Sequence, residues 1–453
     1  MSPTAPPAGS PIGLPGGGAP DPYLPGAGTS AYRVEHYDLF LDYKVASNRL
    51  SGRAVLRGVA QEPASAIVLD LTGLRATKVQ LDGRKAARFS QRAEQLVVST
   101  PVPLEPGQPF TLEVRYEGNP APRRGFWGEV GWEELSDGVL VAGQPNGAPS
   151  WFPCNDHPRD KASYRFTVTT DANYRAVCNG TLQGHTTRSS RETWTYDQAE
   201  PMATYLATVQ IGRYQLLELD AGRHPGQVTQ LVAVPPALAV QARLGLAHQP
   251  AMMRTFINCF GPYPFPAYTV VVAEDVLEIP LEAQGMSILG PNHLELDWEA
   301  QRLVAHELSH QWFGNSLTAA SWQDIWLHEG FACYAEWIWS EEAGVMGVAD
   351  RAAAAWRRLN ADAQDLLVGD PGPEHMFDDR VYKRGALALH AVRVACGDLA
   401  FFALLQEWAT AHRHGSVATA DFILAVDRAT GLDSEALLHP WLYEEALPPL
   451  PGS

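Results

Sequence analysis

The sequence has few cysteines, and none of them are spaced as in a disulfide framework. Its 453 residues include five cysteines, which are odd in number, far apart and without a C-x-x-C pair. This pattern is typical of free thiols in a reducing compartment. The chain also lacks any apolar run of the ~20 residues that a membrane-spanning helix needs. Its first residues lack the basic and apolar regions of a secretory signal, so we expect a cytoplasmic protein.

Positive charge is scarce as well. The 34 Lys and Arg residues stand against 51 Asp and Glu residues, which gives a net charge of −17. Nucleic acids and anionic membranes are bound through clustered Lys and Arg, so neither is an expected partner. Long-range steering would mildly favour cationic substrates. A hydrophobic content of 45% and a charged content of 19% are ordinary for a globular protein, and the length suggests two or three domains.

Four segments follow from the local patterns. Residues 1–30 are rich in Pro and Gly, which predicts a disordered tail. Residues 31–220 show short runs of alternating apolar and polar residues, which predict an all-β domain, a saddle or sandwich. In residues 221–447 the period changes to that of helices, for example over Leu238–Phe260, and an α+β domain is expected there. Residues 448–453 are expected to form a second tail. On its own the β half is also typical of a binding module.

The strongest chemical signal is the stretch from His306 to Glu329. His306-Glu307-Leu308-Ser309-His310 places two imidazoles four residues apart, and on a helix both then face one point. Two neutral imidazoles and a carboxylate form the ligand set of a hydrolytic zinc, with a fourth position left for water. We expect Glu329, on a helix over residues 322–339, as the third ligand. Glu307 can then serve as the general base. Cobalt or manganese would also fit these ligands.

The motif also resembles a known family. With the flanking Gln311–Asn315 and the spacing to Glu329, it is similar to the aminopeptidase N family of gluzincin zinc metallopeptidases, which includes the leukotriene epoxide hydrolase. The resemblance covers about residues 32–447 and stops where most relatives continue into a helical C-terminal domain. It implies a β domain followed by a thermolysin-like catalytic domain with one zinc per chain. The implied activity is removal of N-terminal residues from peptides.

The resemblance implies roles for three further residues. Gln144, upstream of Phe152-Pro153-Cys154, and Glu282 match the family positions that bind the free amine of the substrate. A carboxylate near the metal would pair with a free N-terminus and leave internal peptides without a partner. Tyr382 matches the catalytic tyrosine, whose phenol can donate to the oxyanion. The following Lys383 and Arg384 are expected at a solvated helix start.

The segment around Glu282 departs from the family pattern Gly-x-Met-Glu-Asn. Ile279 replaces the glycine, Pro280 has no N–H to offer an extended substrate, and Ala283 replaces the amide. A hydrolase with relaxed or non-peptide (epoxide) substrates and an inactive zinc-bound scaffold that binds peptides therefore stay as alternatives.

Two acidic residues are candidates for orienting a ligand histidine. Glu336 lies seven residues after Glu329, two helical turns on and on the same face. Asp324 is a competing candidate for holding a ligand histidine in orientation. The sequence predicts neither the preferred N-terminal residue nor the oligomeric state.

Overall fold

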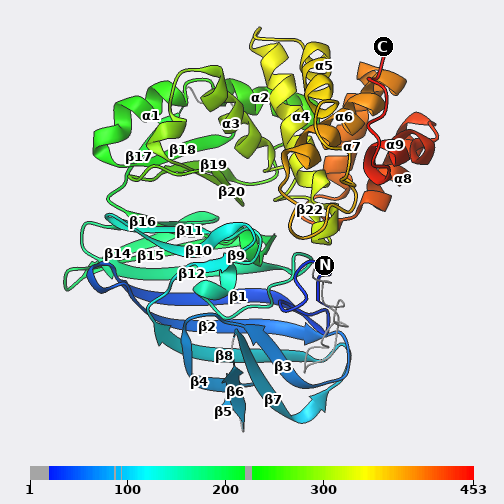
Figure 1. Cartoon of the computed structure of the whole chain (residues 1–453). Coiled ribbons are helices and arrows are strands. Elements are labelled where there is room, and N and C mark those ends of the chain that lie inside the picture. The colour runs from blue at the N-terminus through cyan, green and yellow to red at the C-terminus, as the bar shows by residue number, and fades with distance from the viewer. Residues whose placement is uncertain (1–19, 86–87, 93, 220–226, 453) are drawn as a thin grey trace, which may run out of the picture.

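The computed structural model describes residues 20–85, 88–92, 94–219 and 227–452, which form two stacked halves (Figure 1). The first half consists of strands and short 3-10 turns, and the second combines a sheet with helices. This arrangement confirms the predicted order of an all-β domain followed by an α+β domain.

An eight-stranded sheet forms the base of the first half. Side chains along its long strands alternate between buried and exposed, as in β1, where Tyr37, Leu39 and Leu41 face the core. Strands β1 and β12 pair in parallel and the other neighbours are antiparallel. In sheet order the strands are β14 (Thr181–Arg188), β15 (Arg191–Ala203), β12 (Lys161–Asp171), β1 (Tyr32–Lys44), β2 (Arg49–Ala60), β8 (Pro109–Gly118), β4 (Arg75–Leu81) and β5 (Arg84–Lys85).

Two smaller sheets complete the first half. One has the order β13 (Arg175–Cys178), β16 (Val209–Gly212), β11 (Gly138–Ala142), β10 (Gly128–Leu135) and β9 (Arg123–Gly125). The other has the order β3 (Ala64–Asp70), β7 (Gln95–Leu104) and β6 (Phe89–Arg92). Fully buried aromatic side chains, among them Trp132, Trp151 and Phe152, fill the space between the sheets.

A five-stranded sheet of the second half lies over the first half. Its order is β17 (Gln215–Leu219), β18 (Thr229–Val234), β19 (Ala267–Val272), β21 (Met286–Leu289) and β20 (Leu281–Ala283). Helices α1 (Ala239–Gly245), α2 (Gln249–Phe260) and α3 (Trp298–Ser309) lie on the face turned away from the first half (Figure 1). The other face packs on the first half, where Leu140 and Tyr214 join Val271 and Ile288 in one apolar cluster. The short strand β20 lies at one edge of this sheet, and β17 lies at the other.

The remaining helices pack beside this sheet, and a close crossing of two of them positions the candidate site. They are α4 (Trp326–Glu342), α5 (Val348–Leu359), α6 (Asp379–Cys396), α7 (Asp398–Ala411), α8 (Thr419–Thr430) and α9 (Ser434–Tyr443), with a two-stranded ladder of β22 (Thr318–Ala319) and β23 (Ser416–Val417). A Cβ on Gly330 of α4 would lie 2.9 Å from the carbonyl carbon of Gly385 on α6. Only glycines allow this approach, and it brings the neighbouring Glu329 and Tyr382 into one site.

Buried polar contacts fix the two halves to each other. The Nζ of Lys161 on β12 donates to the carbonyl oxygens of Asn315 at 3.0 Å, Ser316 at 2.8 Å and Gly415 at 3.1 Å. On another side, the Nε1 of Trp127 donates to Pro373 O at 2.9 Å. These contacts attach the β half to three segments of the second half, one after α3, one before α6 and one before β23.

The predicted N-terminal tail is partly wrong. Residues 20–30 are folded against both halves: the Oδ2 of Asp21 accepts a hydrogen bond from Trp322 N at 3.0 Å, and Asp70 accepts one from Gly28 N. Several of their apolar side chains are buried (Tyr23, Leu24 and Ala27). The Pro- and Gly-rich composition predicts disorder, but it gives no sign that these three apolar side chains pack against the rest of the protein. Residues 1–19 lie outside the described residues.

Other boundaries also differ from the sequence prediction. Strand β17 pairs with β18, so the second half begins at residue 215 and not at 221. The predicted helix over Leu238–Phe260 is divided into α1 and α2, because Pro250 lacks an N–H and fits only the first turn of a helix. The predicted tail after residue 447 is packed at its start, where Trp356 Nε1 donates to Pro448 O. Residue 453 lies outside the described residues.

Two further observations concern the environment of the protein. All five cysteines are free thiols. Within the described residues, no helix has the length and apolar character needed to cross a bilayer. The cytoplasmic location stays a prediction.

Candidate active site

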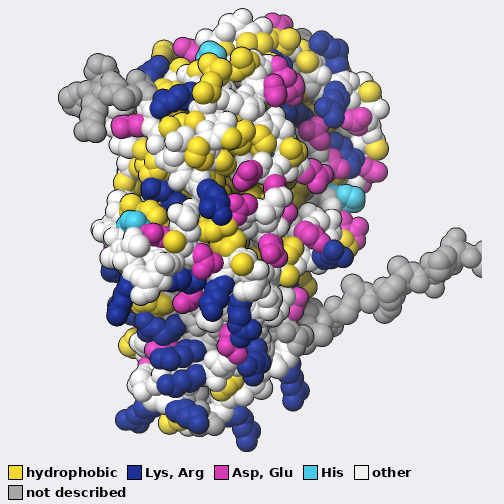
Figure 2. All heavy atoms as spheres, turned by 90° about the vertical axis from the view of Figure 1, so that its left-hand side faces the viewer, with side chains coloured by type: hydrophobic (Ala, Val, Ile, Leu, Met, Phe, Trp, Pro, Cys, Tyr) yellow, Lys and Arg dark blue, Asp and Glu magenta, His cyan; other side chains and the backbone are white. Residues whose placement is uncertain are grey.

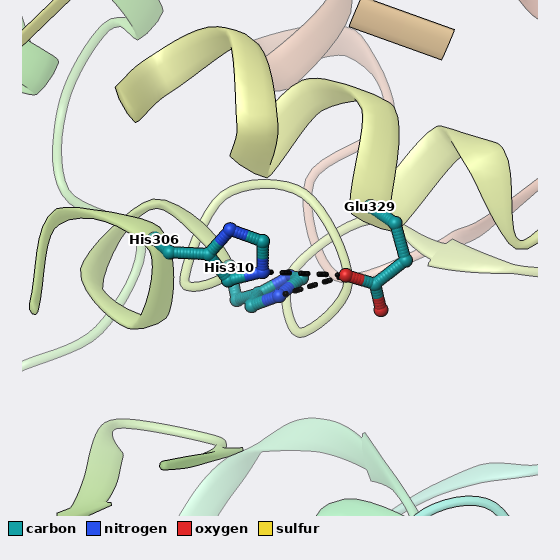
Figure 3. A group of neighbouring side chains, drawn as sticks. All are labelled: His306, His310 and Glu329. Atoms are coloured by element: carbon teal, nitrogen blue, oxygen red, sulfur yellow. Dashed lines mark ion pairs between the residues drawn. The ribbon is translucent and has the colours of Figure 1, made fainter. Parts of the chain in front are cut away.

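The structure brings together the three residues predicted to bind a metal (Figure 3). His306 lies in the last turn of α3, His310 is its C-cap, and Glu329 lies in the first turn of α4. The Oε2 of Glu329 is 3.3 Å from the Nε2 of His306 and 3.5 Å from the Nε2 of His310. The three ligand atoms lie within 4.8 Å of one another, and all three residues are buried.

The other ring nitrogen of each histidine has its own partner. The Nδ1 of His306 is 2.8 Å from the Oε1 of Glu336, and the Nδ1 of His310 is 3.0 Å from the carbonyl oxygen of Phe313. Each Nδ1 can therefore carry the proton and donate it, which leaves both Nε2 lone pairs directed at the same point. This arrangement is the one that a metal-binding imidazole requires.

The electrostatics of the site favour a cation at its centre. Burial alone would lower the pKa of His306, but hydrogen bonds to Glu329 and Glu336 raise it to about 9. Burial also opposes the charge of His310, yet Glu329 and Glu282 raise its pKa to about 10. Although burial raises the pKa of Glu329, the two histidines hold it well below its usual range. A divalent metal would take the place of the protons that these shifts favour, so the residues fit zinc.

Glu307 is free to act as a base beside these ligands. It is buried, its Oε2 has no hydrogen-bond partner among the described residues, and burial raises its pKa. A buried carboxylate oxygen without a partner is unusual in a folded protein and indicates a place for a water or ligand proton.

The two predicted amine-binding residues contact each other. Gln144, which follows β11, donates from Nε2 to the Oε1 of Glu282 on β20 at 2.6 Å. The Glu282 carboxylate also lies within 4.8 Å of ligand atoms of Glu307 and His310. Burial, together with the nearby Glu307 and Glu329 charges, raises the pKa of Glu282 to about 7, although His310 opposes the shift. Two side chains, one from each half of the molecule, therefore meet beside the metal ligands.

Two residues with a supporting role were missed in the sequence. Gln311 Nε2 donates to the carbonyl oxygens of Ala283 and Met286 at 3.2 Å, and Asn315 Nδ2 donates to Ala283 O at 2.9 Å. These contacts attach strand β20, and with it Glu282, to the segment that follows the zinc motif. The signal was available, because both are polar residues in the matched stretch Gln311–Asn315.

Tyr382 lies against the metal ligands. Its ring stacks on that of His306, with 5.9 Å between centroids and an interplanar angle of 18°. Burial and the charges of Glu329, Glu282 and Glu307 raise the pKa of its phenol well above the usual value. The hydroxyl therefore stays protonated and remains a hydrogen-bond donor at neutral pH.

The two acidic candidates behind the ligands have different roles. Glu336 holds the Nδ1 of His306 and is itself held by Arg302 Nη1 at 3.1 Å and Lys383 Nζ at 3.9 Å. The prediction for Asp324 is wrong: its Oδ1 accepts hydrogen bonds from Thr419 N and Oγ1 at the start of α8. Asp324 precedes α4 in a 3-10 turn, so it does not share the helical face of Glu329.

The prediction that Lys383 and Arg384 lie at a solvated helix start is also wrong. Lys383 contacts Glu336 and the Sγ of Cys333. Arg384 is 4% exposed and donates to five carbonyl oxygens from residues 440–446. Both cations are needed inside the fold, one beside the metal site and one at the end of α9.

Replacing Glu336 by Gln should weaken zinc binding by about 10–100-fold, because an amide holds the His306 proton less strongly than a carboxylate does. The measurement is competition for zinc against a chelating dye. Glu342→Gln, an exposed change at the end of the same helix, is the matched control and should bind zinc like the wild type. Unchanged affinity in Glu336→Gln would show that this carboxylate does not support the ligand.

The chain is similar to known peptidases along most of its length. Residues 33–206 match the peptidase M1 N-terminal domain, and residues 245–441 match the peptidase family M1 domain. Leucyl aminopeptidase of Saccharolobus solfataricus is 25% identical, over 92% of this chain and 54% of that protein. Human endoplasmic reticulum aminopeptidase 1 is 26% identical, over 88% of this chain and 46% of that protein. The chain thus spans about half the length of these curated relatives.

A solved structure matches over almost its full length. It is a mutant of an M1 zinc metallopeptidase from Deinococcus radiodurans, bound to a Tyr-Ser-Ala substrate, with 32% identity and a TM-score of 0.88. The match covers 95% of this chain and 98% of that one. With both M1 domains in order and a full-length structural match at this identity, the chain belongs to the peptidase M1 family.

Proposed function

We propose that the protein is a zinc-dependent aminopeptidase that removes N-terminal residues from peptides. The observation that carries the proposal is the hydrogen bond from Gln144 Nε2 to Glu282 Oε1, which joins an amide to a carboxylate that lies within 4.8 Å of ligand atoms of Glu307 and His310. Such a pair can receive the ammonium group of a free N-terminus, and a blocked or internal peptide offers it no partner. The aminopeptidase relatives and the Tyr-Ser-Ala substrate in the structural neighbour support this substrate class.

His306, His310 and Glu329 would hold one zinc ion per chain. When bound, zinc lowers the pKa of a water molecule and polarises a carbonyl group. Glu307, whose Oε2 has no hydrogen-bond partner in the described part of the chain, would accept the proton of a water molecule and return it to the departing amine. Tyr382 donates from its protonated phenol to the oxyanion, and Glu336 keeps His306 in orientation.

The edge strand β20 offers a backbone for the substrate. No described strand pairs with its outer side, so an extended peptide can add there by main-chain hydrogen bonds. Pro280, just before β20, has no N–H to give, so fewer such bonds are available than on an ordinary edge strand. We propose that the charge of Glu282 accordingly carries much of the selection for a free amine.

Amino-acid arylamides with a free amine should be hydrolysed, and their N-acetylated forms should not. In Glu282→Gln, kcat/KM for the free-amine substrates should fall about 10–100-fold, because a charge-assisted hydrogen bond of about 1.5–3 kcal/mol is lost. Glu278→Gln, an exposed change in the loop just before β20, is the matched control and should keep wild-type activity. Equal hydrolysis of free and acetylated substrates would favour the hydrolase with relaxed specificity.

A further inference from the structure

A cavity lies behind the metal-ligand group, between α3, α4, α5 and α6. Its volume is about 300 Å³. Since a water molecule occupies ~30 Å³ in the liquid, this space holds a small ion with several waters but no peptide. Glu336 forms part of its wall, so one carboxylate separates the cavity from His306.

The lining carries more positive than negative charge. Four cations (Arg302, Arg351, Arg358 and Lys383) line the cavity with three carboxylates. This excess is unusual in its surroundings, because residues 215–453 hold 30 of the 51 Asp and Glu but only 13 of the 34 Lys and Arg. Most Lys and Arg residues belong to the first half, and Figure 2 shows them gathered over its strands. A positive cavity within the acidic half therefore indicates an anionic ligand.

Each of the three carboxylates already has a cation. Glu336 is held by Arg302 and Lys383, and Arg302 also contacts Glu299 at 3.1 Å. Asp379 is 3.2 Å from the Nη2 of Arg358. The carboxylates of the cavity are thus neutralised from within its wall.

Arg351 is the cation that is left over. Its Nε donates to Ser340 Oγ at 2.9 Å, and its guanidinium carbon lies 4.2 Å from the ring centroid of Trp298. Its Nη groups have no hydrogen-bond or ion-pair partner among the described residues. A second donor of the lining is also unmatched, because the buried Nε1 of Trp298 has no acceptor there. The charged Nη groups of the half-buried Arg351 and the buried Nε1 of Trp298 thus lack acceptors among the described residues, and both can donate to oxygens of a ligand in the cavity.

We propose that this cavity binds a small tetrahedral oxyanion such as inorganic phosphate or sulfate, with Arg351 as its principal partner. The planar guanidinium fork fits two oxygens of such an ion, and the contact with the Trp298 ring limits the movement of the guanidinium. Arg302 and Lys383 contribute their field from the opposite wall, where they also hold Glu336. The proposal does not depend on the peptidase activity, because none of its donors is among the groups assigned to catalysis.

Inorganic sulfate is the probe for the test. We expect the melting temperature of the zinc-loaded protein to rise saturably with sodium sulfate, compared with sodium chloride at equal ionic strength. In Arg351→Gln the half-saturating concentration should increase at least about tenfold, and Arg351→Lys, which keeps the charge without the fork, should lie between. Arg357→Gln removes the same charge from an exposed position on α5 outside the cavity, and should respond like the wild type.

Two results would overturn the proposal. One is an equal sulfate response in Arg351→Gln and Arg357→Gln. The rise in melting temperature would then come from the general exclusion of sulfate from protein surfaces and not from binding in the cavity. The other comes from crystals soaked in selenate at the saturating concentration. We expect an anomalous selenium peak beside Arg351, and its absence from the cavity would exclude the site even if a variant failed to fold.

Discussion

Replacing Glu307 by Gln should lower kcat by about 10²–10⁴-fold and leave the zinc content unchanged. Gln has nearly the shape of Glu but cannot accept a proton from water. The ligand atoms of His306, His310 and Glu329 lie within 4.8 Å of one another, and we expect these three residues to hold the metal without Glu307. The measurement is steady-state hydrolysis of an amino-acid arylamide beside metal analysis of the same sample.

The control for this variant is Glu295→Gln, an exposed change just before α3, which should keep wild-type kcat. Full activity in Glu307→Gln would remove Glu307 from the reaction. Loss of zinc together with activity would instead make it part of the metal site.

Replacing Tyr382 by Phe should lower kcat by about 10²–10³-fold with little change in KM, because only a donor to the oxyanion is removed. The aromatic ring that stacks on His306 is retained, so the ligand should keep its place. Steady-state kinetics with the same arylamide separate the two constants.

Tyr334→Phe removes a buried hydroxyl from α4 that contacts His390, outside the candidate site, and should leave kcat unchanged. If Tyr382→Phe raised KM and spared kcat, the phenol would bind substrate in the ground state and would not stabilise the oxyanion.

The metal-ligand group was predictable because its geometry is local. The spacing of four positions along a helix sets the relative direction of the His306 and His310 side chains. A second helix then has to bring only one carboxylate to them. The same argument placed Glu336 two turns after Glu329 on α4. No such argument was available for Asp324, which lies before α4 begins, so the helical period does not apply to it.

The roles of Lys383 and Arg384 could not be read from their neighbours in the sequence. Both charges stand near the start of an amphipathic helix, where solvent exposure is the usual outcome. The carbonyl groups that accept from Arg384 belong to residues 440–446, more than fifty positions later. Lys383 is likewise half-buried against Glu336 and Cys333 on another helix. Burial of a charged side chain depends on such distant partners, and the local sequence does not predict them.

The N-terminal segment was predicted to be disordered, and part of it is folded. Its composition is that of a disordered chain, yet residues 20–30 supply Tyr23 and Leu24 to the core and Asp21 to the backbone of Trp322. A few anchoring side chains outweigh the average composition when a surface is ready to receive them.

Zinc reconstitution tests the central claim most directly. The protein is stripped of metal with a chelator, and hydrolysis of a free-amine arylamide is followed as zinc is returned. The account predicts no hydrolysis without metal and a linear recovery that ends at one zinc per chain, with no recovery in Glu329→Gln at the same zinc concentrations. Hydrolysis that survives complete removal of the metal, or one bound zinc per chain without any hydrolysis, would contradict it.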